Sequence, residues 1–172
     1  MIRCLKLLAS LALFAVLCGC AHYQLGFAGT LETQSIRSIY VDWLENETFE
    51  AQQVVPYTQA IREALLETGT FRLTSSPVDA DAVLTVRLEN FDRTRQANRS
   101  DDTGLALLYR NEITAIVSLI ANSDGRTFLD ARTFNVSANA LASQGLQSAE
   151  FQQTPTLARL LANQIRDAIL GL

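Results

Sequence analysis

The sequence predicts an α+β fold in which two helices pack on one face of a mixed, mainly antiparallel four-stranded sheet. Three observations favour this fold. A strand pattern over residues 38–43 leads into a helix pattern over 56–68. The turn sequence NSDG at 122–125 separates two long alternating runs, and an apolar stripe over 155–170 ends the chain. The main elements therefore follow the order strand, helix, three strands, helix.

The first half of the domain contains one strand, one loop and one helix. Ile39, Val41 and Trp43 alternate with polar positions, which is typical of a half-buried strand, and we expect Trp43 to pack. A polar loop is expected over residues 44–53. In the helix over 56–68, Pro56 suits the first turn and Gly69 is placed to cap the C-terminus.

Three further strands follow a short strand over 71–74. Alternation predicts a long strand over 82–94, with Leu84, Val86 and Leu88 on one face. Residues 95–103 are polar and predict a long exposed loop. Strands over 112–121 and 126–138 flank the NSDG turn as an antiparallel hairpin. The first strand-helix-strand unit should make one right-handed crossover and one parallel pair.

The last helix is predicted from its cap and its stripe. Thr154 suits the N-cap and Pro155 the first helical position. Helical spacing joins the apolar positions Leu157, Leu160, Leu161, Ile165, Ala168 and Ile169. We interpret this stripe as core, and residues 139–153 as a small, polar connection.

The N-terminus has the pattern of a lipoprotein signal peptide over residues 1–19. Arg3 and Lys6 precede an apolar run that is shorter than the roughly 20 residues of a membrane-spanning helix. The run ends in the sequence LCGC at 17–20, which resembles the bacterial lipobox. Cleavage before Cys20 would leave this residue with acyl chains such as palmitate, and several chains anchor stably.

The segment that follows the anchor is predicted to be a tether. Residues 20–35 are polar and contain glycine, so the folded domain should span 36–172. Ala21 follows Cys20, which by analogy with Gram-negative sorting sends the protein to the outer membrane. The chain would then face the periplasm or a barrel lumen.

Composition excludes several classes of function. Cys4 and Cys18 would leave with the signal peptide, so no disulfide is expected. The only histidine, His22, lies next to the anchor, which argues against a metal site or a histidine base in the domain. Beyond the signal, 12 arginines face 18 acidic residues for a net charge of −6, which argues against nucleic-acid binding.

No constellation typical of an enzyme occurs, and no cofactor or metal is predicted. The chain has no glycine-rich phosphate loop, no nucleophile elbow and no zinc helix. Two acidic pairs, Asp79 with Asp81 and Asp101 with Asp102, lie in or beside predicted loops and are interpreted as solvated. Asp79 and Asp81 more plausibly turn the chain into the long strand.

Arginines near the end of the long strand are the best candidates for a binding site. Arg87, Arg93 and Arg95 have the same strand parity, opposite Leu84, and Arg99 lies in the following loop. On an open sheet face, their guanidinium groups would suit phosphate or carboxylate. A solvated face whose charge is balanced by nearby acids is the alternative. A larger patch would add Arg110, Arg126 and Arg132.

Short motifs across the chain resemble the lipopolysaccharide-assembly lipoprotein family LptE. They are, in order, Cys20 followed by YQLG at 23–26, IYV at 39–41, ENET at 45–48, GTFRL at 69–73 and ADAVL at 80–84. The family's usual Val-Pro-x-Phe is replaced by VDWL at 41–44. The resemblance covers Cys20 to Leu172 and agrees with the predicted two-helix, one-sheet fold.

The resemblance implies a non-enzymatic function. Family members plug the lumen of the outer-membrane β-barrel LptD, assist its assembly and bind lipopolysaccharide through basic residues. The region from Arg93 to Arg99 is where we would place that contact, on charge and strand parity alone. The alternative is a lipoprotein activator or secretion component, of the peptidoglycan-synthase activator or curli-secretion type, because related motifs occur there.

Overall fold

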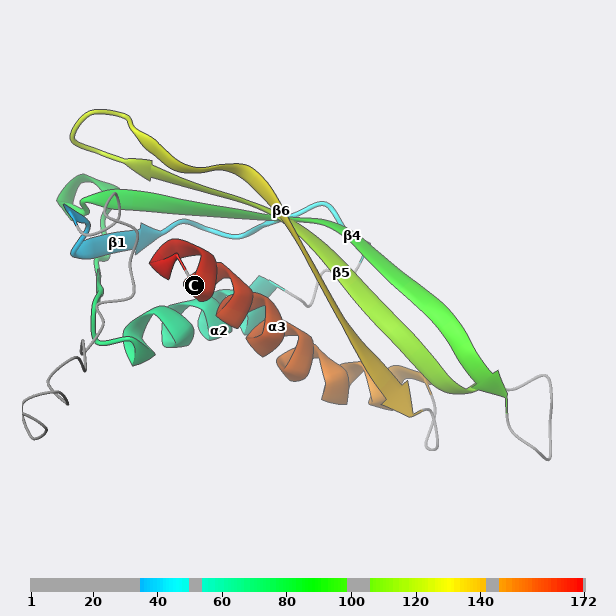
Figure 1. The fold of residues 1–172 in the computed structure, drawn as a ribbon. Coiled ribbons are helices and arrows are strands. Elements are labelled where there is room, and N and C mark those ends of the chain that lie inside the picture. The colour runs from blue at the N-terminus through cyan, green and yellow to red at the C-terminus, as the bar shows by residue number, and fades with distance from the viewer. Residues whose placement is uncertain (1–34, 50–53, 99–105, 142–145, 172) are drawn as a thin grey trace, which may run out of the picture.

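The computed structural model describes residues 35–49, 54–98, 106–141 and 146–171. Figure 1 shows a long twisted sheet with two helices on one side. The elements in chain order are β1 (Ser38–Val41), β2 (Glu45–Asn46), α2 (Val54–Glu67), β3 (Arg72–Leu73), the 3₁₀ turn η4 (Pro77–Asp79), β4 (Ala82–Asn98), β5 (Ala106–Ala121), β6 (Thr127–Leu141) and α3 (Leu146–Leu170).

The sheet is mixed, but it has six strands and not four. Its order is β3-β1-β4-β5-β6, and β2 pairs with β4. Only β4–β5 and β5–β6 are antiparallel; β1–β3, β1–β4 and β2–β4 are parallel. The parallel pairing of β1 with β4 confirms the expected parallel pair, and two further parallel pairs accompany it. Of the two short strands, β3 lies within the short strand predicted over 71–74. Strand β2 lies where a polar loop was predicted over 44–53, and its two residues are too few for an alternating pattern to reveal.

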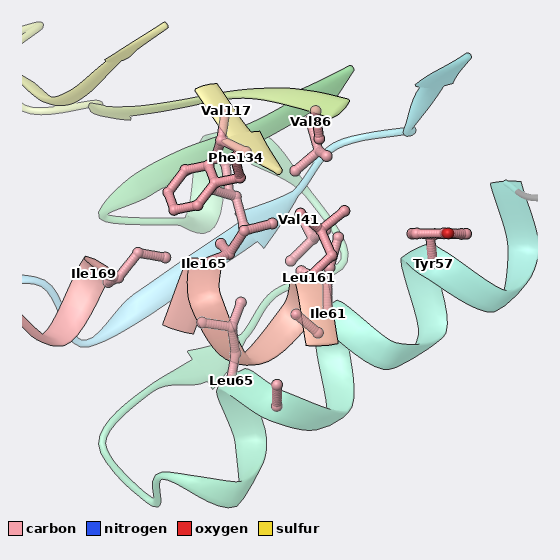
Figure 2. Packing of buried hydrophobic residues seen from close by; sticks show 14 of the residues in the cluster. Val41, Tyr57, Ile61, Leu65, Val86, Val117, Phe134, Leu161, Ile165 and Ile169 are labelled. Atoms are coloured by element: carbon pink, nitrogen blue, oxygen red, sulfur yellow. The ribbon is translucent and has the colours of Figure 1, made fainter. Parts of the chain in front are cut away.

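Both helices cover the same face of the sheet, and the core lies between them and the strands (Figure 2). Tyr57, Ile61 and Leu65 of α2 and Leu161 and Ile165 of α3 are buried there. They meet buried strand residues from β1, β4, β5 and β6, among them Val41, Val86, Val117 and Phe134. The two-helix, one-face architecture is thus as predicted, except that Leu160 of α3 is 39% exposed.

The ends of several elements differ from the prediction. Helix α3 begins at Leu146, so Pro155 lies inside the helix and not at its first position. Pro155 lacks an N–H, and the helix therefore continues past it without one of its hydrogen bonds. The arms of the β4–β5 hairpin are also longer than expected, because β4 runs to Asn98 and β5 starts at Ala106. Polar residues 95–98 are strand because their backbone pairs with β5.

Two turns form where glycine permits a positive φ. Gly69 follows α2 with φ +64°, and its N–H donates to the Leu66 carbonyl at 3.0 Å. Gly125 closes the β5–β6 hairpin with φ +69°, and its N–H donates to the Ala121 carbonyl at 3.1 Å. Both turns lie where the sequence predicts them.

Trp43 does not pack as predicted, because one extra residue lies between β1 and β2. Val41 pairs with Leu84, but Glu45 pairs with Arg87, so four steps on one strand match three on the other. The irregularity buries Leu44 (2% exposed) in place of Trp43 (74% exposed).

The carboxylate of Asp81 joins the start of β4 to the start of β1. Its Oδ2 accepts the backbone N–H groups of Arg37 at 3.0 Å and Ser38 at 2.8 Å, and the Ser38 hydroxyl at 2.8 Å. The N–H of Arg37 and then the two Ser38 groups hold the pKa of this carboxyl below its usual value. Asp81 therefore fixes the position where the chain enters the long strand β4, as the sequence predicts.

Candidate functional site

The predicted arginine site depends on β4, and β4 contains a bulge at Glu89. Leu88 pairs with Ala115 of β5, and Asn90 pairs with the next residue, Thr114. Glu89 is therefore an extra residue, and side chains after it alternate with the opposite parity. The expectation that Arg87, Arg93 and Arg95 share one face is wrong for this reason.

Arg87 lies before the bulge on the open face of the sheet, away from the helices. Its Nη1 is 3.1 Å from Oε1 of Glu47, and the two side chains are 37% and 52% exposed. An ion pair this exposed contributes little to stability. It does, however, compensate the positive charge of Arg87, as expected for a solvated face.

Arg93 and Arg95 lie after the bulge on the face that the helices cover. Arg93 pairs with Asn111 of β5 and Arg95 with Tyr109, and Asn111 is buried on this face. The Arg93 guanidinium carbon is 5.9 Å from the centre of the Phe91 ring. This distance is typical of a cation–π contact.

These arginines belong to a distal arm, which we define as residues 90–98 of β4, 106–114 of β5 and 135–141 of β6. Both Arg93 and Arg95 are exposed there. In Figure 1 the arm extends beyond the sheet formed with β1, and α3 runs beneath it. The arm thus presents two cationic side chains on the side of α3.

A buried polar contact fastens α3 to the arm, and the sequence reasoning missed it. Nδ2 of Asn111 donates to Oε1 of Gln153 at 2.6 Å, and the two residues are 1% and 6% exposed. Asn111 continues the buried alternation of Ile113 and Ala115, which is the signal that could have revealed it. Because Asn111 pairs with Arg93, the contact fixes the backbone beside the arginines.

The other arginines do not extend this surface. Arg110 lies on the open face, where its Nη2 donates to Oγ of Ser137 at 2.9 Å. Arg126 follows the β5–β6 turn and is 3.5 Å from a carboxylate oxygen of Asp124. Arg132 is on the helix face, and its guanidinium carbon is 5.2 Å from the centre of the Phe134 ring. It pairs with Val117, which is six residues along β5 from Asn111, so Arg132 lies outside the distal arm.

Several predicted features lie outside the described residues: Cys20, the tether, Arg99 and the pair Asp101 and Asp102. Within the part of the chain that the structure describes, no three His, Cys, Asp or Glu side chains are grouped as a metal site requires. In that same part, no helix is both long and apolar enough to cross a membrane.

Several solved structures share the α+β fold of this chain at low identity. Protein XCC0632 from Xanthomonas campestris has a TM-score of 0.54 at 13% identity, over 80% of this chain and 87% of its own. Protein CT253 from Chlamydia trachomatis has 0.52 at 11%, over 80% and 100%. A candidate lipoprotein from Caulobacter crescentus CB15 has 0.50 at 16%, over 74% and 88%.

The fold thus places the chain in a class of small α+β domains that includes bacterial lipoproteins. No curated protein matches the sequence. The model of the LptE family, described as lipopolysaccharide-assembly, matches residues 36–169, and the chain belongs to this family. The match begins at buried Ile36 and ends at buried Ile169.

Proposed function

We propose that this protein is a lipid-anchored outer-membrane subunit of the lipopolysaccharide translocon. In this role it plugs an LptD-type β-barrel, assists the assembly of that barrel and binds lipopolysaccharide for delivery to the outer leaflet. The observation that carries the proposal is the family match over residues 36–169. The function needs no catalytic group, in agreement with the absence of enzyme motifs from the sequence.

The shape and polarity of the domain support a plug. The core is contiguous across both helices and four strands, which makes a rigid body. The uncovered face of the sheet carries the polar side chains Thr114, Ser118, Asn135 and Ser137 along β5 and β6, together with apolar Ile116 and Ile120 of β5. Thr114 donates to Asn135 at 2.7 Å, so this polar surface is held in place across the strands. Such a surface suits the hydrophilic lumen of a large barrel.

Arg93, Arg95 and Arg99 are proposed to bind the phosphate groups of lipopolysaccharide. The two described members are exposed, lie on the same side of the distal arm and are two residues apart on β4. Planar guanidinium groups bind phosphate oxygens with two parallel hydrogen bonds. Arg87 was predicted to join them, but it lies on the other face and is paired with Glu47.

Replacing Arg93, Arg95 and Arg99 together with Ser should weaken the binding of the full-length protein to purified lipopolysaccharide by about tenfold, since several charge-assisted contacts are lost. The matched control replaces Arg87, Arg110 and Arg126, which removes the same charge from other surfaces. Equal losses in both variants would refute the assignment of the contact to the arm, and unchanged affinity in a folded first variant would refute the contact itself.

The partner is tested separately by affinity purification of the lipidated protein from membranes. Recovery of a large barrel in equal amount is expected. Its repeated absence would contradict the plug and favour the activator or secretion role. A triple-arginine variant that still recovers the barrel would show that lipid binding and barrel binding use different surfaces.

A further inference from the structure

The distal arm has two free edges. On the β4 side, β2 reaches only as far as Leu88, so among the described residues no strand pairs with the outer side of 90–98. On the other side, β6 is the last strand of the sheet order, and none of the described strands pairs with its outer side. A free strand edge exposes backbone donors and acceptors in a row and is a template for another strand.

The β4 edge is protected against such pairing. It carries the charged residues Asp92, Arg93 and Arg95, and its register with β5 is irregular between Arg95 and Asn98. Charges and bulges are the usual means by which proteins prevent unwanted strand addition.

The β6 edge lacks these protections over the nine residues Thr133–Leu141. Their sequence, TFNVSANAL, contains no charged residue, no proline and no glycine. Their pairing with β5 runs without a register shift from Thr133 to Leu141. The irregularity in β6 lies earlier, where Ala131 has φ +45°, so it limits the regular edge without interrupting it.

This edge is complementary to itself when two copies run antiparallel about Ser137. On the open face, the exposed amide Asn135 would lie opposite the second copy's Asn139. On the helix face, a large residue would lie opposite a small one: Val136 opposite Ala138, and Phe134 opposite Ala140. No like charges meet, so the pairing avoids the repulsion that destabilises neighbouring strands.

We propose that two copies of this chain associate by antiparallel pairing of Thr133–Leu141 about Ser137, which joins their sheets into one. The interface is the same patch on both copies, as a two-fold dimer requires. The proposed function, on which this timing rests, places a single copy inside the barrel. The dimer is therefore the state of the lipoprotein before it meets a barrel, and it protects the edge during that time.

The test uses the full-length chain with Ser137→Cys, which places two thiols opposite each other at the two-fold axis. Cys4 and Cys18 leave with the signal peptide and Cys20 is modified in the expected mature form, so the added thiol is the only one. Treatment of membranes with a short thiol cross-linker should convert the protein to a species of twice its mass. The unsubstituted chain and a Thr94→Cys variant, on the β4 edge, should remain at the mass of one chain.

A second variant adds Asn135→Lys and Asn139→Lys to Ser137→Cys, which brings four positive charges together at the interface and should abolish the cross-linked dimer. The matched control places the same charges on the other edge, Asn90→Lys with Thr94→Lys, and should leave the dimer intact. No dimer from a folded Ser137→Cys variant, a dimer insensitive to the β6 lysines, or cross-linking only to another protein would overturn the proposal. None of these outcomes bears on lipopolysaccharide or barrel binding.

Discussion

At the scale of single residues, the most informative side chains are polar groups inside or beside the core. Asp81 accepts three hydrogen bonds from the start of β1. Tyr57 is fully buried, and its hydroxyl has no hydrogen-bond partner within the described part of the chain. Burial raises the pKa of this hydroxyl well above its usual value, so Tyr57 stays neutral. The hydrogen bonds of Asp81 stabilise the fold. The buried Tyr57 hydroxyl destabilises it, because no described group replaces the hydrogen bonds that the hydroxyl makes to water in the unfolded chain.

Replacing Asp81 with Asn should lower the free energy of unfolding at pH 7 by about 1 kcal/mol, the value of hydrogen bonds to a charged group discounted for exposure. The folded pKa is below the unfolded value of about 3.9. The contribution is therefore complete above that value and is lost as the pH falls through the folded pKa. Urea unfolding at several pH values measures it, with Asp79→Asn as control. A loss of unfolding free energy in Asp81→Asn that persists at low pH would contradict its assignment to the ionised carboxylate.

Replacing Tyr57 with Phe should leave the free energy of unfolding unchanged or raise it by up to about 1 kcal/mol, because the variant removes a buried hydroxyl that has no described partner. Tyr57→Ala, in contrast, should cost about 3–5 kcal/mol through the cavity it leaves. Urea midpoints of both variants provide the measurement. A clear loss in Tyr57→Phe would mean that the hydroxyl does have a partner.

At the scale of elements, local signals predicted most of the structure and bulges caused the main errors. The NSDG turn, the stripe of α2 and the alternation of β4 up to Leu88 all correspond to the observed elements. Two extra residues, one between Val41 and Glu45 and one at Glu89, are defined only by pairing with neighbouring strands. No residue type in the sequence indicates them. The charge near Arg93 could thus be predicted from the sequence, but the face that carries it could not.

Adjacent substitutions at the first irregularity test the register directly. Leu44→Ala should lower the free energy of unfolding by about 2–5 kcal/mol, because Leu44 is buried. Trp43→Ala should change it by less than about 0.5 kcal/mol, because the indole is exposed. Thermal or urea unfolding compares the two. The reverse ranking would restore the simple alternation predicted from the sequence.

At the scale of the whole molecule, the fold separates its surfaces by chemistry. One face of the sheet is covered by α2 and α3, and the opposite face carries polar side chains with apolar ones such as Ile120 among them. The distal arm presents Arg93 and Arg95 on the side of α3. It has one charged edge, along β4, and one uncharged edge, along β6. The domain enters this architecture at Ile36, after the predicted tether. Its position at a membrane would therefore depend on the anchor proposed at Cys20.

The anchor is tested by two neighbouring substitutions in the signal region. Cys20→Ser should abolish acylation and release the protein from the membrane fraction, because stable anchoring requires the acyl chains. Cys18→Ser should retain both, because Cys18 is expected to leave with the signal peptide. Mass spectrometry of the N-terminus and membrane fractionation measure the outcome. Loss of acylation in the Cys18 variant alone would assign the anchor to that residue instead.

The extra residue at Glu89 affects how functions are transferred between relatives of this protein. In an alignment without a gap, a relative that lacks the bulge places the residue aligned with Arg93 on the opposite face of its sheet, even when that residue is also an arginine. An identical residue at one alignment position then does not indicate a shared contact. A gap of one position in the alignment determines whether the two residues lie on the same face of the sheet. Comparisons across the family should therefore count residues between Leu88 and Asp92 before assigning the same ligand to the same position.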